Sequence, residues 1–193
     1  MDLKNNFIKY VNLINSITND TDFKVVEELF KEMTNCFESR GRIFLAGNGG
    51  SAAIANHASA DLAKLSKNGN YLNVISLTTN IPQLTANSND DGYENALTLN
   101  LRNFYINNKD IIITISSSGN SKNIINLIEY ATKNKAKSYS LLGFDGGSAK
   151  NTEGNFIVFN SKNGYYGPIE DIHMMLFHYF AHTIKKDISE LNE

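Results

Sequence analysis

A histidine and an aspartate, His57 and Asp61, stand four residues apart in the stretch LAGNGGSAAIANHASAD, residues 45–61. In an α-helix this spacing places two side chains on one face, one turn apart. An imidazole beside a carboxylate can ligate a divalent metal, or it can position a general base. The alternative is a buried histidine whose hydrogen bonds are satisfied by the aspartate, and the pair taken alone leaves both interpretations open.

The segment IEDIHMMLFHYFAHTI, residues 169–184, is apolar around nearly its whole helical circumference, which predicts burial. It also carries polar side chains, namely Glu170, Asp171, His173, His178 and His182. Because buried polar groups are costly without partners, these side chains require partners, a metal ion or a solvated cleft. One weaker alternative makes His178 and His182, four residues apart, the metal-binding pair.

Two loops of small residues follow expected strands. GNGGS, residues 47–51, follows RIFLAG, and its glycines allow close approach of a ligand at the start of a helix, where an anion is favoured. A tight turn without a ligand explains this loop equally well, and it matches neither a Walker loop nor a clear GxGxxG pattern.

The second loop, TISSSGNS at residues 114–121, places the hydroxyls of Ser116, Ser117, Ser118 and Ser121 beside the first turn of a helix. Hydroxyls and backbone N–H groups suit a phosphate without positive side chains. Ordinary helix capping is the alternative, but it needs only one serine. We therefore favour a phosphate-binding loop.

Alternating strands and helices are expected to carry these loops. Apolar runs predict strands at 42–47, 73–78, 110–117, 138–144 and 155–160, and periodicity predicts helices at 2–17, 22–39, 50–66, 93–105, 120–135 and 168–186, with Gly41 closing the second helix. This order predicts an α/β fold in which a parallel sheet is covered by helices on both faces. Ligands bind beyond the carboxyl ends of such strands, where both loops lie.

Composition limits the classes of function. The chain has 193 residues, 41% of them hydrophobic, and a net charge of −2, which argues against a broad nucleic-acid-binding surface. Its one cysteine, Cys36, cannot form a disulfide within the chain, which fits a reducing compartment. Neither a signal peptide nor a membrane-spanning run is evident, so we expect a cytoplasmic protein with no membrane or nucleic-acid partner.

Taken together, the motifs GNGGSAA, SNDDGY, SSSGNS, GFDGG and the terminal IxxxHxxxxH occur in an order and spacing that resemble the sugar isomerase (SIS) domain superfamily, and within it the bacterial phosphoheptose isomerases. The resemblance covers nearly the whole chain. It implies one SIS domain over 1–193, a three-layer sandwich with a five-stranded parallel sheet, in which two leading helices (1–40) precede the α/β core (41–193).

The resemblance also assigns roles to residues. It implies zinc ligands at His57, Asp61, Glu170 and His178, with Asp61 as the base and His178 as its acid/base partner. It implies substrate contacts, in addition to Asp61 and Glu170, at Asn48, Gly49, Gly50, Asn89, Asp90, Ser116, Ser117, Ser118 and Ser121.

This chain departs from the family pattern at three positions. Family members carry Glu at the position of Asp61, Gln at that of Glu170 and Asp at that of Gly167. Aspartate is one methylene shorter than the family glutamate, so the carboxylate of Asp61 lies about 1.5 Å closer to its own backbone. Two histidines and two carboxylates remain a sound zinc-binding set. The changes raise the chance of a different phosphosugar substrate.

The expected reaction is aldose–ketose isomerisation of sedoheptulose 7-phosphate, or of a closely related sugar phosphate, to a D-glycero-D-manno-heptose 7-phosphate through a metal-assisted enediol. Glu170 and His178 are eight residues apart, about 12 Å along a helix, so one zinc ion cannot easily take both from one chain. We therefore expect a site shared between chains, and the family resemblance implies a homotetramer with active sites at subunit interfaces.

Two other classes of function compete with an enzyme. A non-catalytic SIS-fold protein, of the type that associates with replication initiators, would lose metal-site residues, whereas this chain keeps ligand-capable side chains at all four positions. A sugar-phosphate-sensing regulator usually carries a DNA-binding module, for which this chain has no room.

Overall fold

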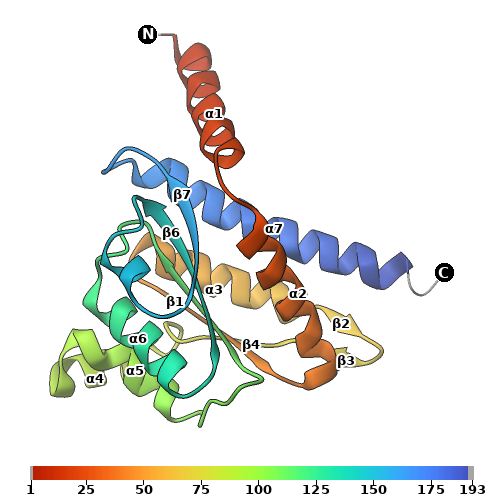
Figure 1. The fold of residues 1–193 in the computed structure, drawn as a ribbon, viewed down its shortest axis with the longest axis vertical. Helices are drawn as coiled ribbons and strands as arrows, with labels where there is room; N and C mark the ends of the chain where they lie inside the picture. Colours follow the sequence, from red (N-terminus) through yellow and green to blue (C-terminus); the bar gives the residue numbers. More distant parts are fainter. Residues whose placement is uncertain (1, 191–193) are drawn as a thin grey trace.

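The computed structural model describes residues 2–190, with side chains as far as residue 186. Five parallel strands form one sheet in the order β4-β1-β5-β6-β7 (Figure 1). They are β1 (Arg42–Gly47), β4 (Asn73–Ser76), β5 (Ile111–Ser116), β6 (Lys137–Phe144) and β7 (Asn155–Asn160). The expected α/β architecture with a five-stranded parallel sheet is confirmed.

Helices cover both faces of the sheet because successive strand residues point to opposite sides. One face, with Ile43 and Leu45 of β1, packs against α1 (Leu3–Asn19), α2 (Lys24–Ser39), α3 (Gly50–Leu62) and α7 (Tyr166–Glu190). The other face, with Phe44 and Ala46, packs against α5 (Tyr93–Arg102) and α6 (Lys122–Lys133). The three central strands β1, β5 and β6 are therefore almost wholly buried, which is typical of a parallel sheet.

The strand order determines where a ligand can bind. The chain moves outward from β1 to β4 and then returns to β5 on the other side of β1. Ligands of open α/β sheets bind at such a switch point, outside the carboxyl ends of the two strands. Gly47 pairs with Ile115 in the register of β1 and β5, so the loops that follow these strands emerge side by side.

Helices α3 and α7 lie beside each other on one face of the sheet and run in the same direction (Figure 1). Their N-terminal ends therefore flank the edge of the sheet from which the two loops emerge. Helix α1 extends away from the body of the protein and exposes apolar side chains such as Leu3 and Phe7.

Three small elements were not predicted. They are helix α4 (Ile81–Asp91), the two-stranded hairpin β2 (Ser66–Lys67) with β3 (Asn70–Tyr71), and the 3₁₀ helix η1 (Ser148–Asn151). The hairpin also shows that the predicted helix 50–66 was too long, because α3 ends at Leu62.

The prediction that Gly41 closes α2 was wrong in detail. Arg40 adopts the left-handed conformation at the helix end, with φ of 55°. Gly41 is required for a different reason, since a Cβ at this position would collide with the backbone carbonyl of Lys109. Among the described helices, none combines the length and the hydropathy needed to cross a membrane.

Candidate active site

Three predicted metal ligands converge between α3 and α7. The Nε2 atom of His57 lies 3.0 Å from Nε2 of His178 and 3.1 Å from Oδ2 of Asp61. Their ligand atoms all lie within 4.8 Å of one another, although His178 is 121 residues from His57 in the sequence. Both imidazoles are exposed and Asp61 is partly exposed, so a ligand from solvent can reach them.

This triad fits a divalent metal ion. Zinc is held by nitrogen and oxygen atoms at about 2.0–2.2 Å, which places two tetrahedral ligand atoms about 3.3 Å apart. The observed separations of 3.0 and 3.1 Å are close to that value. Two imidazoles and a carboxylate are also the donor types that zinc uses, and a catalytic site leaves a further position for substrate or water.

The serine loop forms one wall of a small cavity of about 190 Å³. The cavity is lined by Asn48, Ser51, Ile115, Ser116, Ser117, Ser118, Ser121, Tyr166 and Glu170. It lies where the carboxyl ends of β1 and β5 meet the N-terminal ends of α3, α6 and α7. Helix N-termini present unpaired N–H groups, so this position favours an anion.

The hydroxyls of the serine loop have different roles. Ser116 accepts a hydrogen bond from the backbone N–H of Gly119 at 3.1 Å and so holds the loop itself. Ser121 occupies the N-cap position of α6, yet within residues 2–186 its side chain makes no capping hydrogen bond. The buried hydroxyl of Ser117 also finds no protein partner in that range. Capping therefore does not account for the loop, and the hydroxyls of Ser117 and Ser121 remain available to a phosphate.

Substituting Ser121 with alanine tests this division. We expect Ser121→Ala to lower the affinity for a sugar phosphate about tenfold, because a charge-assisted hydrogen bond contributes about 1.5–3 kcal/mol. Its thermal midpoint should change little, since no capping bond is lost. In the matched variant Ser116→Ala the thermal midpoint should also fall, because this change removes the hydrogen bond from Gly119 that holds the loop. Calorimetric titration and thermal unfolding measure the two effects, and a Ser121→Ala protein with unchanged affinity contradicts the phosphate-binding role.

The glycine loop is tied to the helices around it. The side-chain oxygen of Asn48 accepts hydrogen bonds from the hydroxyl of Tyr93 at 2.7 Å and from the amide of Asn123 at 2.9 Å. Gly49 has φ of 52°, and a Cβ on Gly50 would collide with the carboxylate of Glu170. The loop thus needs glycine at position 49 because of its backbone conformation, and the close approach of Gly50 to Glu170 brings the start of α3 against the start of α7.

Two groups of predicted site residues lie outside the triad. Glu170 lines the serine-loop cavity and is not a member of the His57, Asp61 and His178 cluster, as the rise of the helix predicts. Asn89 and Asp90 are exposed on α4, where the amide of Asn89 donates to Asp90 at 2.9 Å, and they do not line the cavity. Their role as substrate contacts therefore stays a prediction.

The remaining polar groups of α7 have separate environments. His173 is fully buried beside Phe159, and neither ring nitrogen has a hydrogen-bond partner in the described part of the chain. Burial lowers the pKa of His173 to about 4, although the Leu142 backbone acts to raise it. This imidazole is therefore neutral. His182 is exposed and stands apart from the cluster of His57, Asp61 and His178, which favours His57 over His182 as the partner of His178.

The departure at Gly167 has a structural counterpart in α1. The hydroxyl of Tyr10 donates to Asp171 at 2.5 Å, and a Cβ on Gly167 would lie 3.0 Å from that same hydroxyl. Burial first, and then the hydrogen bond to Asp171, raise the pKa of Tyr10 to about 12. A tyrosine from α1 thus occupies the space beside Gly167. Nothing in the residue pattern indicated this contact, because Tyr10 is 161 residues from Asp171.

Known proteins resemble this chain in sequence and in fold. The family described as "SIS domain" matches residues 6–143. A phosphoheptose isomerase of Helicobacter pylori is 36% identical over 158 residues, which cover 80% of each chain, and one from Leptospira biflexa is 35% identical over 165 residues, 84% of this chain and 83% of its own. The solved structure of a phosphoheptose isomerase from Neisseria gonorrhoeae superposes with a TM-score of 0.83 at 25% identity, covering 95% of this chain and 97% of its own.

The sheet order, the glycine and serine loops that follow β1 and β5, and these matches define a SIS-domain protein. Within that class, the chain belongs to the phosphoheptose isomerase family and is a phosphosugar isomerase of the aldose–ketose type.

Proposed function

We propose that the protein interconverts sedoheptulose 7-phosphate, or a closely related sugar phosphate, with the corresponding aldose through an enediol. The convergence of His57, Asp61 and His178 between α3 and α7 carries this proposal. The reaction moves a proton between adjacent carbons and needs a base near the substrate and an acid for its oxygens. We assign these roles to Asp61 and His178, while the serine loop holds the phosphate at the far end of the sugar.

A zinc ion is the metal we propose for the triad, held by His57, Asp61 and His178. When bound, it polarises the substrate carbonyl and offsets the negative charge that develops on the oxygen. The side chains of the triad would hold the ion between the two helices, and Asp61 keeps a second oxygen, Oδ1, directed away from His57 toward Lys64. Glu170 is the fourth zinc ligand of this proposal, contributed by a second copy of the chain.

A shared site follows from where Glu170 lies. In its own chain Glu170 lines the serine-loop cavity, about 12 Å along the helix from His178. If Glu170 of a second copy approaches the triad, the serine loop of that copy comes with it. The phosphate is then held by one chain while the carbonyl end meets the triad of another. We propose a homotetramer with such composite sites at its subunit interfaces.

Mixing two inactive variants tests the composite site. Ser121→Asp retains a residue suited to helix capping but repels phosphate, whereas His178→Ala removes a triad member. When the two are unfolded together, refolded and assayed, about a quarter of the sites should combine an intact loop with an intact triad, if chains assort randomly. Refolded single variants are the controls. A mixture no more active than those controls contradicts a site shared between chains.

The reaction itself is tested by NMR. Zinc-loaded protein incubated with sedoheptulose 7-phosphate and a panel of pentose and hexose phosphates should convert one of them to its aldose partner, and loss of conversion in a chelator should be reversed by zinc. An intact, metal-loaded protein that converts none of these sugars would instead favour the alternative, a non-catalytic SIS-fold protein that binds phosphosugars or another protein.

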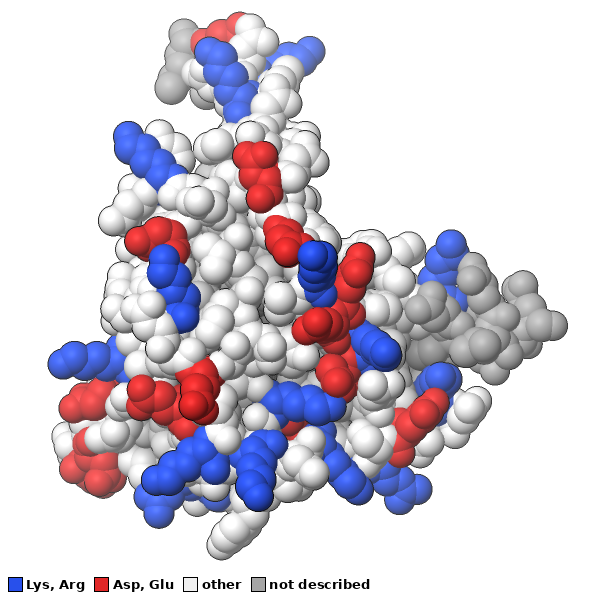
Figure 2. Space-filling model, in the orientation of Figure 1, with Lys and Arg blue, Asp and Glu red and all other residues white. Residues whose placement is uncertain are grey.

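We further propose that residues 1–193 act as one SIS domain in the cytoplasm, without nucleic-acid or membrane partners. The single cysteine, Cys36, is buried and free, which suits a reducing compartment. On the face shown in Figure 2, acidic and basic side chains lie intermixed, and the chain has a net charge of −2. This distribution is unlike the basic stripe that a nucleic-acid interface needs.

A further inference from the structure

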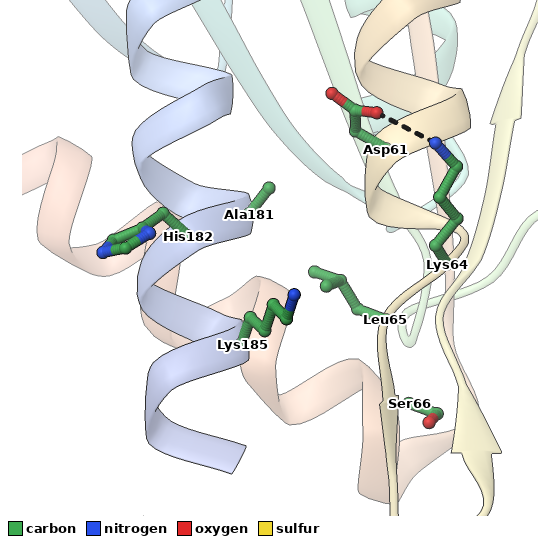
Figure 3. A pocket seen from close by; sticks show the side chains of 7 residues that line it. All are labelled: Asp61, Lys64, Leu65, Ser66, Ala181, His182 and Lys185. Carbon is green, nitrogen blue, oxygen red and sulfur yellow. Dashed lines mark hydrogen bonds and ion pairs between the residues drawn. The ribbon is translucent and has the colours of Figure 1, made fainter. Parts of the chain in front are cut away.

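A second cavity, of about 440 Å³, lies beside the triad, near the C-terminal end of α3. It is lined by Asp61, Lys64, Leu65, Ser66, Ala181, His182 and Lys185 (Figure 3). It shares only Asp61 with the triad and no residue with the serine-loop cavity. The proposed function does not use this space, although it opens directly next to the group assigned as the base.

The cavity has an excess of positive charge. Lys64 and Lys185 approach it from the end of α3 and from α7, and Asp61 is the one acidic residue in its lining. Figure 3 shows the Lys185 ammonium reaching across the space between the two elements, while the His182 ring points away from Asp61. Leu65 and Ala181 supply apolar surface between the lysines. The Lys185 ammonium lies beside this apolar surface, whereas in Figure 3 the Lys64 ammonium is turned toward Asp61. The two lysines can meet at a tetrahedral oxyanion once Lys64 leaves Asp61.

Asp61 connects this cavity to the triad through its two oxygens. Its Oδ2 faces His57 at 3.1 Å, and its Oδ1 faces the ammonium of Lys64 at 3.3 Å. Without a metal ion, Lys64 and Asp61 neutralise each other, and Asp61 repels an incoming anion. A divalent cation bound to the triad would neutralise the negative charge of Asp61 and repel the ammonium of Lys64. The lysine then lacks a counter-charge, which an oxyanion in the cavity can supply.

We propose that this cavity is an oxyanion site whose occupancy is coupled to the metal. A phosphate group between Lys64 and Lys185 strengthens metal binding at His57, Asp61 and His178, and the metal strengthens phosphate binding by the same factor, because linkage is reciprocal. The inference rests on the metal site of the proposed function. Since Lys64 and Lys185 are exposed and their charges are partly screened, we expect a coupling of about fivefold, at the low end of the usual range.

Cobalt titration of the full chain tests the coupling. Co²⁺ reports its ligation by visible absorption and takes the same nitrogen and oxygen ligands. The dissociation constant of Co²⁺ is measured in solutions that contain chloride, sulfate or glycerol 3-phosphate, all at the same ionic strength. Wild type should bind Co²⁺ about fivefold more tightly in sulfate than in chloride. A similar gain with the ester shows that a phosphate monoester can occupy the site, and a gain with sulfate alone restricts the site to free oxyanions.

Variants locate the effect. The Ser121→Asp protein, whose serine loop repels anions, should keep the coupling, whereas Lys185→Met should lose it while binding Co²⁺ in chloride as wild type does. Lys67→Met is the matched control, because Lys67 pairs with Glu38 at 3.6 Å and does not line the cavity. Failure of wild type to bind Co²⁺ overturns the metal site. Tight Co²⁺ binding with the same dissociation constant in sulfate and in chloride overturns this inference alone. Coupling that is unchanged in Lys185→Met does so too.

Discussion

Replacing His178 with alanine should lower turnover of the sugar phosphate by about 10²- to 10⁴-fold, the usual contribution of one general acid–base group. The same change removes one of the three side chains that converge on the proposed metal position, so metal affinity should fall as well. Because His178 is exposed at the surface of α7, its loss leaves no cavity in the core, and the thermal midpoint of the metal-free protein should stay near that of wild type.

The same helix offers a matched control. His182 lies one turn beyond His178, is also exposed and stands outside the triad. His182→Ala should therefore retain both metal and turnover. Metal content by elemental analysis and turnover by NMR decide between the two histidines. If His182→Ala lost its metal while His57→Ala kept it, the pairing of His57 with His178 would be wrong and the rival pairing of His178 with His182 on α7 would be favoured.

Much of the sheet could be predicted because its strands are continuous apolar runs. Ile111 to Ile113 and Ile115 are all buried, and such a run is typical of a strand at the centre of a sheet covered on both faces. Helix α4 has no buried residue, so it lacks the apolar periodicity by which helices are recognised. Its start was nevertheless marked by Asn80, which caps Gln83 at 3.2 Å, and by Pro82 in the first turn.

The missed hairpin also had a local signal. Asn68 and Gly69 both have positive φ, 53° and 77°, which is the backbone of the two-residue turn that Asn-Gly favours. The predicted helix 50–66 ran past the end of α3 to the first residue of this hairpin, and Leu65 stands three residues after Leu62, a spacing that a helix also shows. Both leucines are buried, but Leu62 ends α3 and Leu65 lies in the connection before β2.

Two members of the triad could be predicted from the sequence, and the third depended on tertiary packing. The spacing of His57 and Asp61 places them on one helical face, and the rise between Glu170 and His178 separates those two. That His178 meets His57 follows only from the packing of α7 against α3, with the two helices running in the same direction. Only the family resemblance assigned a role to Asn89 and Asp90. The structure shows both exposed on α4, outside the serine-loop cavity.

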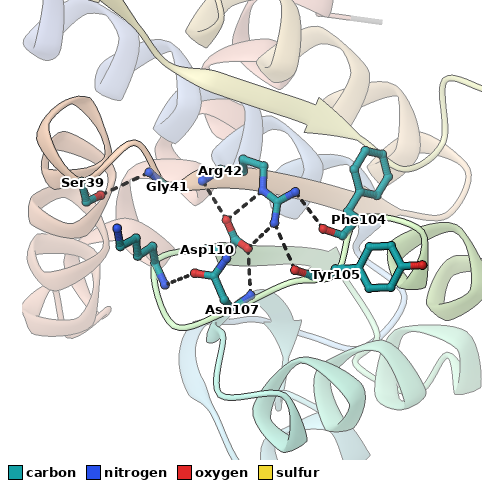
Figure 4. A network of polar contacts seen from close by, with 8 residues as sticks. Ser39, Gly41, Arg42, Phe104, Tyr105, Asn107 and Asp110 are labelled. Atoms are coloured by element: carbon teal, nitrogen blue, oxygen red, sulfur yellow. Dashed lines mark hydrogen bonds and ion pairs between the residues drawn. The ribbon is translucent and has the colours of Figure 1, made fainter.

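At the opposite end of the sheet, a buried carboxylate joins the beginnings of β1 and β5. Asp110 is 1% exposed and accepts hydrogen bonds from the backbone N–H of Arg42 at 3.0 Å and from its guanidinium at 3.0 and 2.6 Å. The backbone N–H of Asn107 donates to the same carboxylate at 2.9 Å (Figure 4). Arg42 also donates to the carbonyl of Phe104 at 2.8 Å, so the ion pair secures the loop before β5.

Asp110→Ala should therefore lower the free energy of unfolding by about 3–5 kcal/mol, because it leaves the partly buried Arg42 and two backbone donors without their acceptor. The Glu32→Ala variant is the control. It breaks the more exposed pair between Glu32 and Lys137 and should cost at most about 1 kcal/mol. Urea unfolding measures both. Equal losses in the two variants would contradict the role assigned to the buried carboxylate.

The loss in Asp110→Ala should depend on pH with a definite sign. Burial alone would raise the pKa of Asp110, but the hydrogen bonds from the Arg42 guanidinium and from the backbone N–H groups of Asn107 and Arg42 outweigh burial and lower it. A carboxyl group with a lowered pKa in the folded state stabilises the protein fully above its unfolded pKa of about 3.9, and this contribution is lost as the pH falls through the folded value. The stability difference between wild type and Asp110→Ala should thus be constant near neutrality and shrink below about pH 4. A difference that instead grew on acidification would show that Asp110 is not held as a carboxylate by Arg42.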